Sequence, residues 1–186
     1  MSTTPMRHIM LDLETLGTKP GSVILSIGAV LFEPKTGGLG ETFYSVISTK
    51  DSLSYGLTVD PNTQAWWNSQ SDEAKAVLTE AQAPEAKSLM TVLNDFKWWV
   101  QSNTVEKANR MVWGNGASFD VPLLEAAYEA TALVPPWNYW GSMCYRTIKN
   151  LNKNTPAPKR EGTHHNALDD AIYQAQHLML LLNENP

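Results

Sequence analysis

The sequence RHIMLDL (residues 7–13) is an apolar run with one carboxylate, Asp12, embedded near its end, a pattern typical of a buried strand. Two more apolar stretches follow, VILSIGAVLF (23–32) and the alternating TFYSVIS (42–48). Glycine-containing turn clusters separate these stretches from one another. Short strands joined by short turns form antiparallel meanders, so this region predicts three antiparallel strands.

After the third strand the pattern becomes mainly helical. Asp60 followed by Pro61 indicates a helix start, with Asp as the N-cap and Pro at the first helical position. The sequence then predicts helices at 61–69, 72–81 and 85–101, a strand at 111–115, a helix at 121–130, a short strand and helix between 140 and 151, and a last helix at 166–182. The apolar face of that last helix is predicted to contain Leu168, Ile172, Ala175, Met179 and Leu182. The order of elements predicts an α/β protein with a mixed sheet flanked by helices.

The composition is that of an ordinary soluble protein, with 42% hydrophobic and 18% charged residues. We expect a single domain spanning residues 1–186, because no repeat, low-complexity tract or linker interrupts the chain. Apolar runs are far shorter than the ~20 residues of a membrane helix, so no membrane association is expected. The N-terminus has no secretory-signal pattern, which makes the cytoplasm the default location.

The net charge of −5 argues against a protein that coats long nucleic acids, since such proteins are usually basic. It leaves open a metal-dependent enzyme that contacts only a few nucleotides. Five cations nevertheless gather in one stretch, where the default interpretation is a solvated face and the alternative is a flap that contacts phosphates: Arg146, Lys149, Lys153, Lys159 and Arg160.

Asp12 and Glu14 stand two positions apart at the end of the first predicted strand, so both should project from the same face. Two carboxylates about 4 Å apart repel by roughly 1 kcal/mol in water and about 4 kcal/mol at an effective dielectric constant near 20. A hard divalent cation such as Mg²⁺ or Mn²⁺ is the obvious neutralising group. Two solvated acids near a turn are the alternative.

Two later segments carry similar chemistry. Asp120 ends a glycine-rich turn at a helix start, where it is either a site residue, a helix N-cap or both. The sequence THHNALDDA places a histidine, the usual proton acceptor near neutral pH, just before a helix whose first turn contains two aspartates. Spacing alone pairs either His164 with Asp169 or His165 with Asp170.

LDLET (11–15), NGASFD (115–120) and HNALDD (165–170) resemble the three motifs of the DnaQ-like DEDDh 3′→5′ exonucleases: D-x-E, an aromatic residue followed by Asp, and H-x-A-x-x-D. Within that superfamily the chain looks most like phage exonuclease A and the exonuclease VIII-like or Rv-type exoribonuclease branch. The stretch WGNG-x-x-FD and the tryptophan pair after Asp60-Pro-Asn-Thr carry this likeness. The motif requires alanine two positions after the histidine, which selects His165 and Asp170.

The resemblance implies a ribonuclease H-like fold and a 3′→5′ exonuclease that releases 5′-mononucleotides from single-stranded DNA or RNA, with DNA slightly favoured. It implies two divalent cations, Mg²⁺ or Mn²⁺, held by Asp12, Glu14 and Asp170 with help from Asp120. His165 would take the proton of the attacking water. Relatives of this type are often dimers, so a homodimer is among the expectations.

Substrate contacts are expected from further residues near these motifs: Thr15, Leu16, Trp66, Trp67, Asn115 and Phe119. Adjacent helical side chains point about 100° apart, so one of the tryptophans at 66 and 67 should be buried and the other nearer the surface. Trp98 and Trp99 are both expected in the core. The alternatives are an endonuclease of the ribonuclease H type, an exoribonuclease, and an inactive nucleic-acid-binding module.

Overall fold

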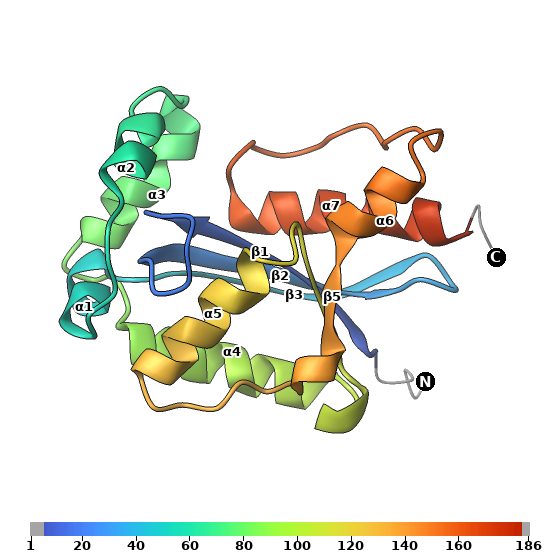
Figure 1. Ribbon diagram of the computed structural model, residues 1–186, viewed down its shortest axis with the longest axis horizontal. Coiled ribbons are helices and arrows are strands. Elements are labelled where there is room, and N and C mark those ends of the chain that lie inside the picture. The colour runs from blue at the N-terminus through green and yellow to red at the C-terminus, as the bar shows by residue number, and fades with distance from the viewer. Residues whose placement is uncertain (1–5, 184–186) are drawn as a thin grey trace.

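The computed structural model describes residues 6–183 and contains a five-stranded mixed sheet in the order β3-β2-β1-β4-β5 (Figure 1). Strand β1 pairs antiparallel with β2 and β2 antiparallel with β3, whereas β1 and β4, and β4 and β5, pair in parallel. The antiparallel meander and the mixed sheet predicted from the sequence are therefore confirmed. The strands are β1 His8–Thr15, β2 Ile24–Glu33, β3 Gly38–Val46, β4 Met111–Gly114 and β5 Ser142–Cys144.

The helices follow the predicted order, with one addition. They are α1 Thr49–Ser54, α2 Pro61–Trp67, α3 Asp72–Gln82, α4 Leu89–Asn103, α5 Asp120–Ala130, α6 Tyr145–Leu151 and α7 Ala167–Asn183, with short 3₁₀ turns at Lys107–Asn109 and Tyr139–Gly141. Helix α1 was not predicted; the Ser48 side chain caps it by accepting the Asp51 N–H at 3.3 Å. No helix in the described part of the chain is both long and apolar enough to span a membrane.

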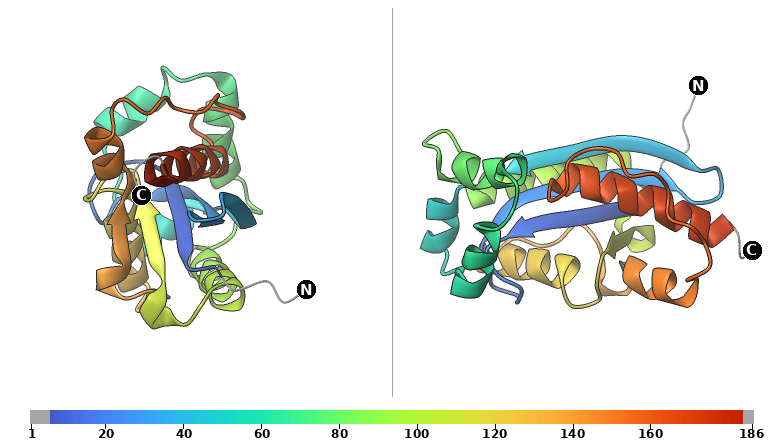
Figure 2. Two further views of the ribbon diagram at one scale, coloured as in Figure 1. Left: turned by 90° about the vertical axis from the view of Figure 1, so that its right-hand side faces the viewer. Right: turned by 90° about the horizontal axis from the view of Figure 1, so that it is seen from above.

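Helices cover both faces of the sheet: α7 lies across one face, and α4 and α5 lie on the other (Figures 1 and 2). Strand β1 alternates between these layers. Ile9, Leu11 and Leu13 belong to the core cluster that also contains residues of α4 and α5, whereas Met10 belongs to the cluster under α7. Because side chains alternate along a strand, Asp12 and Glu14 project to the α7 side.

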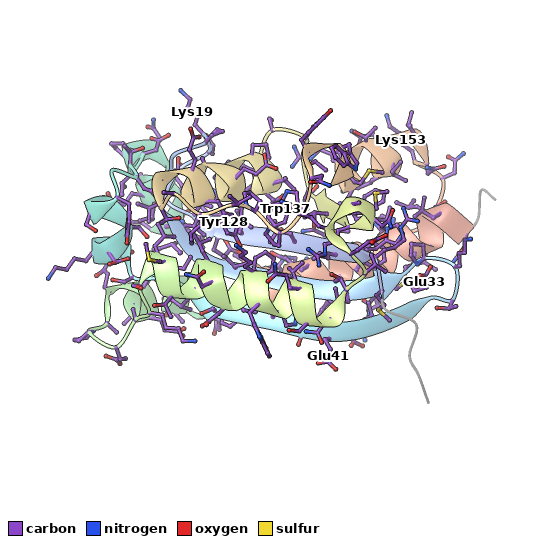
Figure 3. The ribbon with its side chains drawn as sticks, turned by 90° about the horizontal axis from the view of Figure 1, so that it is seen from below. Lys19, Glu33, Glu41, Tyr128, Trp137 and Lys153 are labelled. Carbon is purple, nitrogen blue, oxygen red and sulfur yellow. The ribbon has the colours of Figure 1, made fainter. Side chains whose placement is uncertain are left out.

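The layer between α4 and α5 is closed by aromatic side chains. Tyr128 and Trp137 lie there with ring centroids 5.9 Å apart (Figure 3). The Tyr128 hydroxyl donates to the Leu93 carbonyl oxygen at 3.0 Å, which ties α5 to α4. Trp99 packs in the same core, but Trp98 is 69% exposed, so the prediction of two buried tryptophans was wrong for Trp98. Adjacent residues of α4 point about 100° apart, and only one of them can face the sheet.

Helix α7 sits unusually close to β2. An added Cβ at Gly28 would lie 2.1–2.3 Å from backbone atoms of Ala167 and Leu168, so only glycine fits at this crossing. Gly28 is also the direct neighbour of Asp12 in the sheet. The contact therefore places the first turn of α7, which carries Asp170, beside the carboxylates of β1.

Candidate active site

Asp12 and Glu14 form the first part of the site, at the carboxyl end of the central strand. Glu14 is only 6% exposed, and Asp12 is partly exposed. The Gln174 side-chain amide of α7 donates a hydrogen bond to the Asp12 carboxylate at 2.7 Å. Pairing of β1 with β2 runs through both acids, Asp12 opposite Gly28 and Glu14 opposite Ser26, so their relative position is set by the sheet.

Asp120, the first residue of α5, adds a third carboxylate, which is buried and does not itself line the cavity. One of its oxygens accepts the Leu13 N–H at 3.3 Å and the other accepts the Asn115 N–H at 2.7 Å. Gly114 makes this approach possible, because a Cβ there would lie 2.9 Å from the Asp120 side chain. Asp120 is 1% exposed, so it acts on the site mainly as a buried negative charge.

Asp170 in the first turn of α7 and His165 in the loop before it complete the cluster. The His165 backbone N–H donates to the Asp170 carboxylate at 3.2 Å, and the backbone of His165 is left-handed with φ 62°. The other Asp170 oxygen accepts from the Arg160 guanidinium. Asp169 faces the loop instead and accepts the Thr163 N–H at 2.7 Å.

The three segments meet at one cavity of about 680 Å³. Ligand atoms of Glu14, His165 and Asp170 all lie within 4.8 Å of one another, a spacing that one metal ion could bridge. The cavity is lined by Asp12, Leu13, Glu14, Thr15, Thr18, Asp60, Asn62, Thr63, Trp66, Trp67, Asn115, Phe119, Tyr145, Lys149, Arg160, His164, His165, Asp170, Tyr173 and Gln174.

Burial and mutual repulsion disfavour the charged forms of these acids. Burial, followed by repulsion from Asp120, raises the pKa of Glu14 to about 8. Burial raises the pKa of Asp12 well above its ordinary value, and repulsion from Asp120 and Glu14 adds to the effect. Burial also raises the pKa of Asp120 to about 6, against its hydrogen bonds from backbone N–H groups.

This donor set fits a hard divalent cation. Oxygen-rich sites with several carboxylates suit Mg²⁺ and Mn²⁺, and a bound cation would stabilise the charged forms that burial and mutual repulsion disfavour. His165 differs from the acids, because burial and then the neighbouring His164 and Arg160 lower the pKa of its imidazole. A neutral imidazole can accept a proton near neutral pH.

The sequence matches the family model of the 3′-5′ exoribonuclease Rv2179c-like domain over residues 7–182. The chain belongs to this family. It is accordingly a 3′-5′ exonuclease, and the three DEDDh motifs that suggested this class lie together around the cavity of the Rv2179c-like domain. No sequence among curated proteins matches the chain.

Solved structures share the fold of this Rv2179c-like domain at low identity. The nuclease domain of 3′hExo, a DEDDh family member bound to rAMP, is 14% identical with a TM-score of 0.65, covering 100% of this chain and 96% of that one. Escherichia coli ExoI in a zinc-bound complex with single-stranded DNA is 14% identical with a TM-score of 0.68, covering 98% of this chain and 42% of that one. The mixed sheet flanked by helices is therefore the expected ribonuclease H-like fold.

The predicted substrate-contacting residues have different positions in the Rv2179c-like domain. Trp66 is 43% exposed and places its ring 5.0 Å from that of His165, whereas Trp67 is 1% exposed and donates its indole N–H to the Thr15 carbonyl oxygen at 2.9 Å. Leu16 is 5% exposed, packs in the core and does not line the cavity. The other predicted contacts all line it: Thr15, Trp66, Trp67, Asn115 and Phe119.

The structure adds residues to the site that the sequence did not single out. Gln174 follows Asp170 by one helical turn, so the spacing of four positions could have placed it on the same face of α7. Tyr145 and Tyr173 also line the cavity, and the Arg160 guanidinium lies 5.0 Å from the centroid of the Tyr173 ring. No sequence pattern indicates these tyrosines, because they come from separate helices.

Proposed function

We propose that this exonuclease uses divalent cations to hydrolyse the last phosphodiester bond at the 3′ end of a single-stranded nucleic acid. The observation that carries the proposal is the convergence of Glu14, His165 and Asp170 within 4.8 Å at one cavity. The family match favours RNA as the substrate. Single-stranded DNA, which the sequence motifs slightly favoured, is the second candidate, supported by the structural likeness to ExoI.

Asp12, Glu14 and Asp170 would hold two cations, Mg²⁺ or Mn²⁺, with Asp120 supplying negative charge behind them. Bound there, the cations would lower the pKa of a water molecule and stabilise charge on the scissile phosphate. The imidazole of His165 accepts a proton from the attacking water as its oxygen bonds to phosphorus. The bond from phosphorus to the 3′-oxygen of the preceding nucleotide then breaks, and solvent protonates that oxygen.

The remaining lining residues hold the terminal nucleotide. Trp66, which is 43% exposed, offers a ring surface on which a base can stack, as aromatic side chains do in other single-strand-binding proteins. The buried Trp67 is fixed by its hydrogen bond to the end of β1 and its ring lies 5.2 Å from that of Trp66, so a base resting on Trp66 would keep a constant distance from Glu14. Positioning of this kind contributes strongly to catalysis because the reacting atoms meet in one geometry.

The decisive test is digestion of matched 5′-labelled RNA and DNA oligomers with Mg²⁺ or Mn²⁺. We expect a ladder that shortens from the 3′ end, faster for RNA. An oligomer with a blocked 3′ end should resist, whereas internal cleavage of that oligomer would indicate an endonuclease instead.

His165→Ala in the same assay tests the proton acceptor. Loss of a general base typically lowers the rate by about 10²–10⁴-fold. We expect that loss in kcat, with Mn²⁺ binding measured by calorimetry largely retained because the carboxylates remain. Activity close to that of the native chain would remove His165 from the mechanism.

A further inference from the structure

One stretch of this acidic chain contains Lys and Arg residues but no Asp or Glu. No Asp or Glu occurs between Glu129 and Glu161, and this interval holds five of the 14 Lys and Arg residues; the rest of the chain holds nine cations against 19 acids. All five follow β5, on α6 and in the loop that leads to α7: Arg146, Lys149, Lys153, Lys159 and Arg160. A positive stretch of this kind on a negative protein provides a local site for an anionic ligand.

Two of these five cations line the cavity. Lys149 and Arg160 are the two lining residues with a permanent positive charge in the part of the chain that the structure describes. The Lys149 ammonium lies 5.9 Å from the centroid of the Tyr145 ring, and the Arg160 guanidinium lies over the Tyr173 ring. Arg146 extends to the loop before α5, where it donates to the Asn115 side-chain oxygen at 3.3 Å.

Four of the five cations form no salt bridge with a carboxylate of the described residues. Within residues 6–183 the salt bridges involve Lys75, Lys87 and Arg160, so Arg160 alone of the group is paired. Positions 146 and 149 are three apart in α6, a spacing that puts their side chains along one side of the helix, and Lys153 follows in the turn just after the C-cap residue Asn152. Lys153 lies where α6 ends, at the opposite end of the molecule from Lys19 (Figure 3).

The direction of the substrate follows from the two ends of the cavity. The α2 residues that line the cavity, Asn62, Thr63, Trp66 and Trp67, carry no charge, whereas α6 lines it with Lys149 as well as Tyr145. Figure 1 and the right-hand view of Figure 2 show α2 and α6 well apart. A terminal base fits the aromatic end. The chain of phosphates must then leave the carboxylates on the α6 side.

We propose that Arg146, Lys149 and Lys153 form a track that binds the phosphates of nucleotides upstream of the scissile bond, with the strand continuing 5′-ward along α6. The inference rests on the proposed nuclease function and specifies how that site holds a longer strand. The track contacts phosphates rather than bases. Binding should therefore strengthen with the length of the strand and weaken with salt, but should not depend on base sequence.

The test compares Lys149→Gln/Lys153→Gln with Lys97→Gln/Lys107→Gln, a control that removes the same two charges from α4 and the 3₁₀ turn after it. The readout is kcat/KM for a 12-nucleotide oligomer relative to a dinucleotide. We expect the track variant to lower this ratio about tenfold at low salt, because each lost phosphate contact weakens binding electrostatically. The control variant should keep the native ratio. An unchanged ratio in the track variant would overturn the proposal.

A binding measurement separates this inference from the nuclease assignment. Fluorescence anisotropy of a 5′-labelled 12-nucleotide oligomer is recorded in Ca²⁺ at several salt concentrations, and the oligomer is checked to be intact afterwards. Loss of two contacts should flatten the slope of log Kd against log salt by about 1.4, since each single-strand phosphate contact contributes about 0.7. If the native chain shows the steeper slope and the track variant the flatter one, but the native chain cleaves neither substrate, the nuclease function is rejected and the track is supported. An equal slope in track and control variants rejects the track even in an active enzyme.

Discussion

Arg160 and Asp170 form an ion pair in which one expected metal ligand is already occupied by a protein cation. The two side chains are 21% and 15% exposed, so water screens the pair only partly. The same guanidinium lowers the pKa values of Asp12 and Glu14, against the larger effect of their burial. Arg160 therefore neutralises part of the acidic cluster when no metal is bound, and a metal ion must compete with it for Asp170.

Arg160→Gln should consequently have opposite effects on stability and on metal binding. We expect the metal-free protein to lose about 1–2 kcal/mol of unfolding free energy, because the Asp170 charge loses its partner. The apparent Kd for Mn²⁺ should decrease several-fold, since the ion no longer displaces a guanidinium. Chemical denaturation in EDTA and calorimetric titration with Mn²⁺ measure the two quantities. Weaker Mn²⁺ binding by the variant would show that Arg160 supports the metal site instead of competing with it.

At the scale of elements, the crossing of α7 over β2 determines where the third motif lies. The sequence predicted α7 with an apolar face of Leu168, Ile172, Ala175, Met179 and Leu182. Ala175 and Met179 are buried and Ile172 and Leu182 pack against the same core, so the prediction was wrong only for Leu168. The buried face begins at Ala167 and continues through Ala171, Gln174 and Leu178. The close approach at Gly28 explains the difference, because small alanines face the strand while Asp170 and Gln174 turn toward the cavity.

Gly28→Ala tests this crossing. The new methyl group would overlap the backbone at Ala167, which cannot move without displacing α7. We expect a loss of about 3 kcal/mol of unfolding free energy and at least a tenfold loss of nuclease activity, because Asp170 and His165 move with the helix. Urea denaturation and the oligomer assay measure both effects.

Gly38→Ala is the matched control, since a Cβ there meets only the Thr36 hydroxyl at 3.5 Å. It should retain activity and most of the stability. Equal losses in both variants would mean that the effect is general to glycine replacement in this sheet.

The sequence predicted elements and motifs more reliably than contacts between elements. Hydrophobic periodicity and helix-capping residues located the strands and most helices, and the motif pattern selected His165 over His164. Helix α1 was missed because six residues are too few for a periodic signal. The roles of Tyr145 and Tyr173 could not be predicted, because they depend on how α6 and α7 pack against the sheet.

For the whole molecule, clustering of buried acids makes folding stability depend on pH. Folding raises the pKa of Glu14 from 4.5 to about 8 and that of Asp120 from 3.8 to about 6. An acid with a raised pKa holds its proton more tightly in the folded chain, so the stability is complete below the unfolded pKa and is lost as pH rises through the folded pKa. The sensitive window therefore runs from pH 3.8, the lower of the two unfolded pKa values, to about 8.

We expect the Tm in EDTA to fall by about 5 °C or more between pH 6 and pH 8.5, since 1 kcal/mol corresponds to about 2–4 °C in a protein of this size. Mn²⁺ should raise the Tm, and the increase should grow with pH because the ligands must be deprotonated to bind it. Scanning fluorimetry across this pH range measures both trends. Glu14→Gln should flatten the EDTA profile. A profile that is already flat in the native chain would contradict the electrostatic account of the site.

The contact between Trp66 and His165 gives the site an optical property. The two rings meet edge to face, with centroids 5.0 Å apart and an interplanar angle of 87°. A protonated imidazole quenches the fluorescence of an adjacent indole, whereas a neutral imidazole does not. The difference in fluorescence between the native chain and Trp66→Phe therefore reports, without any added dye, when this single loop histidine gains a proton or moves away.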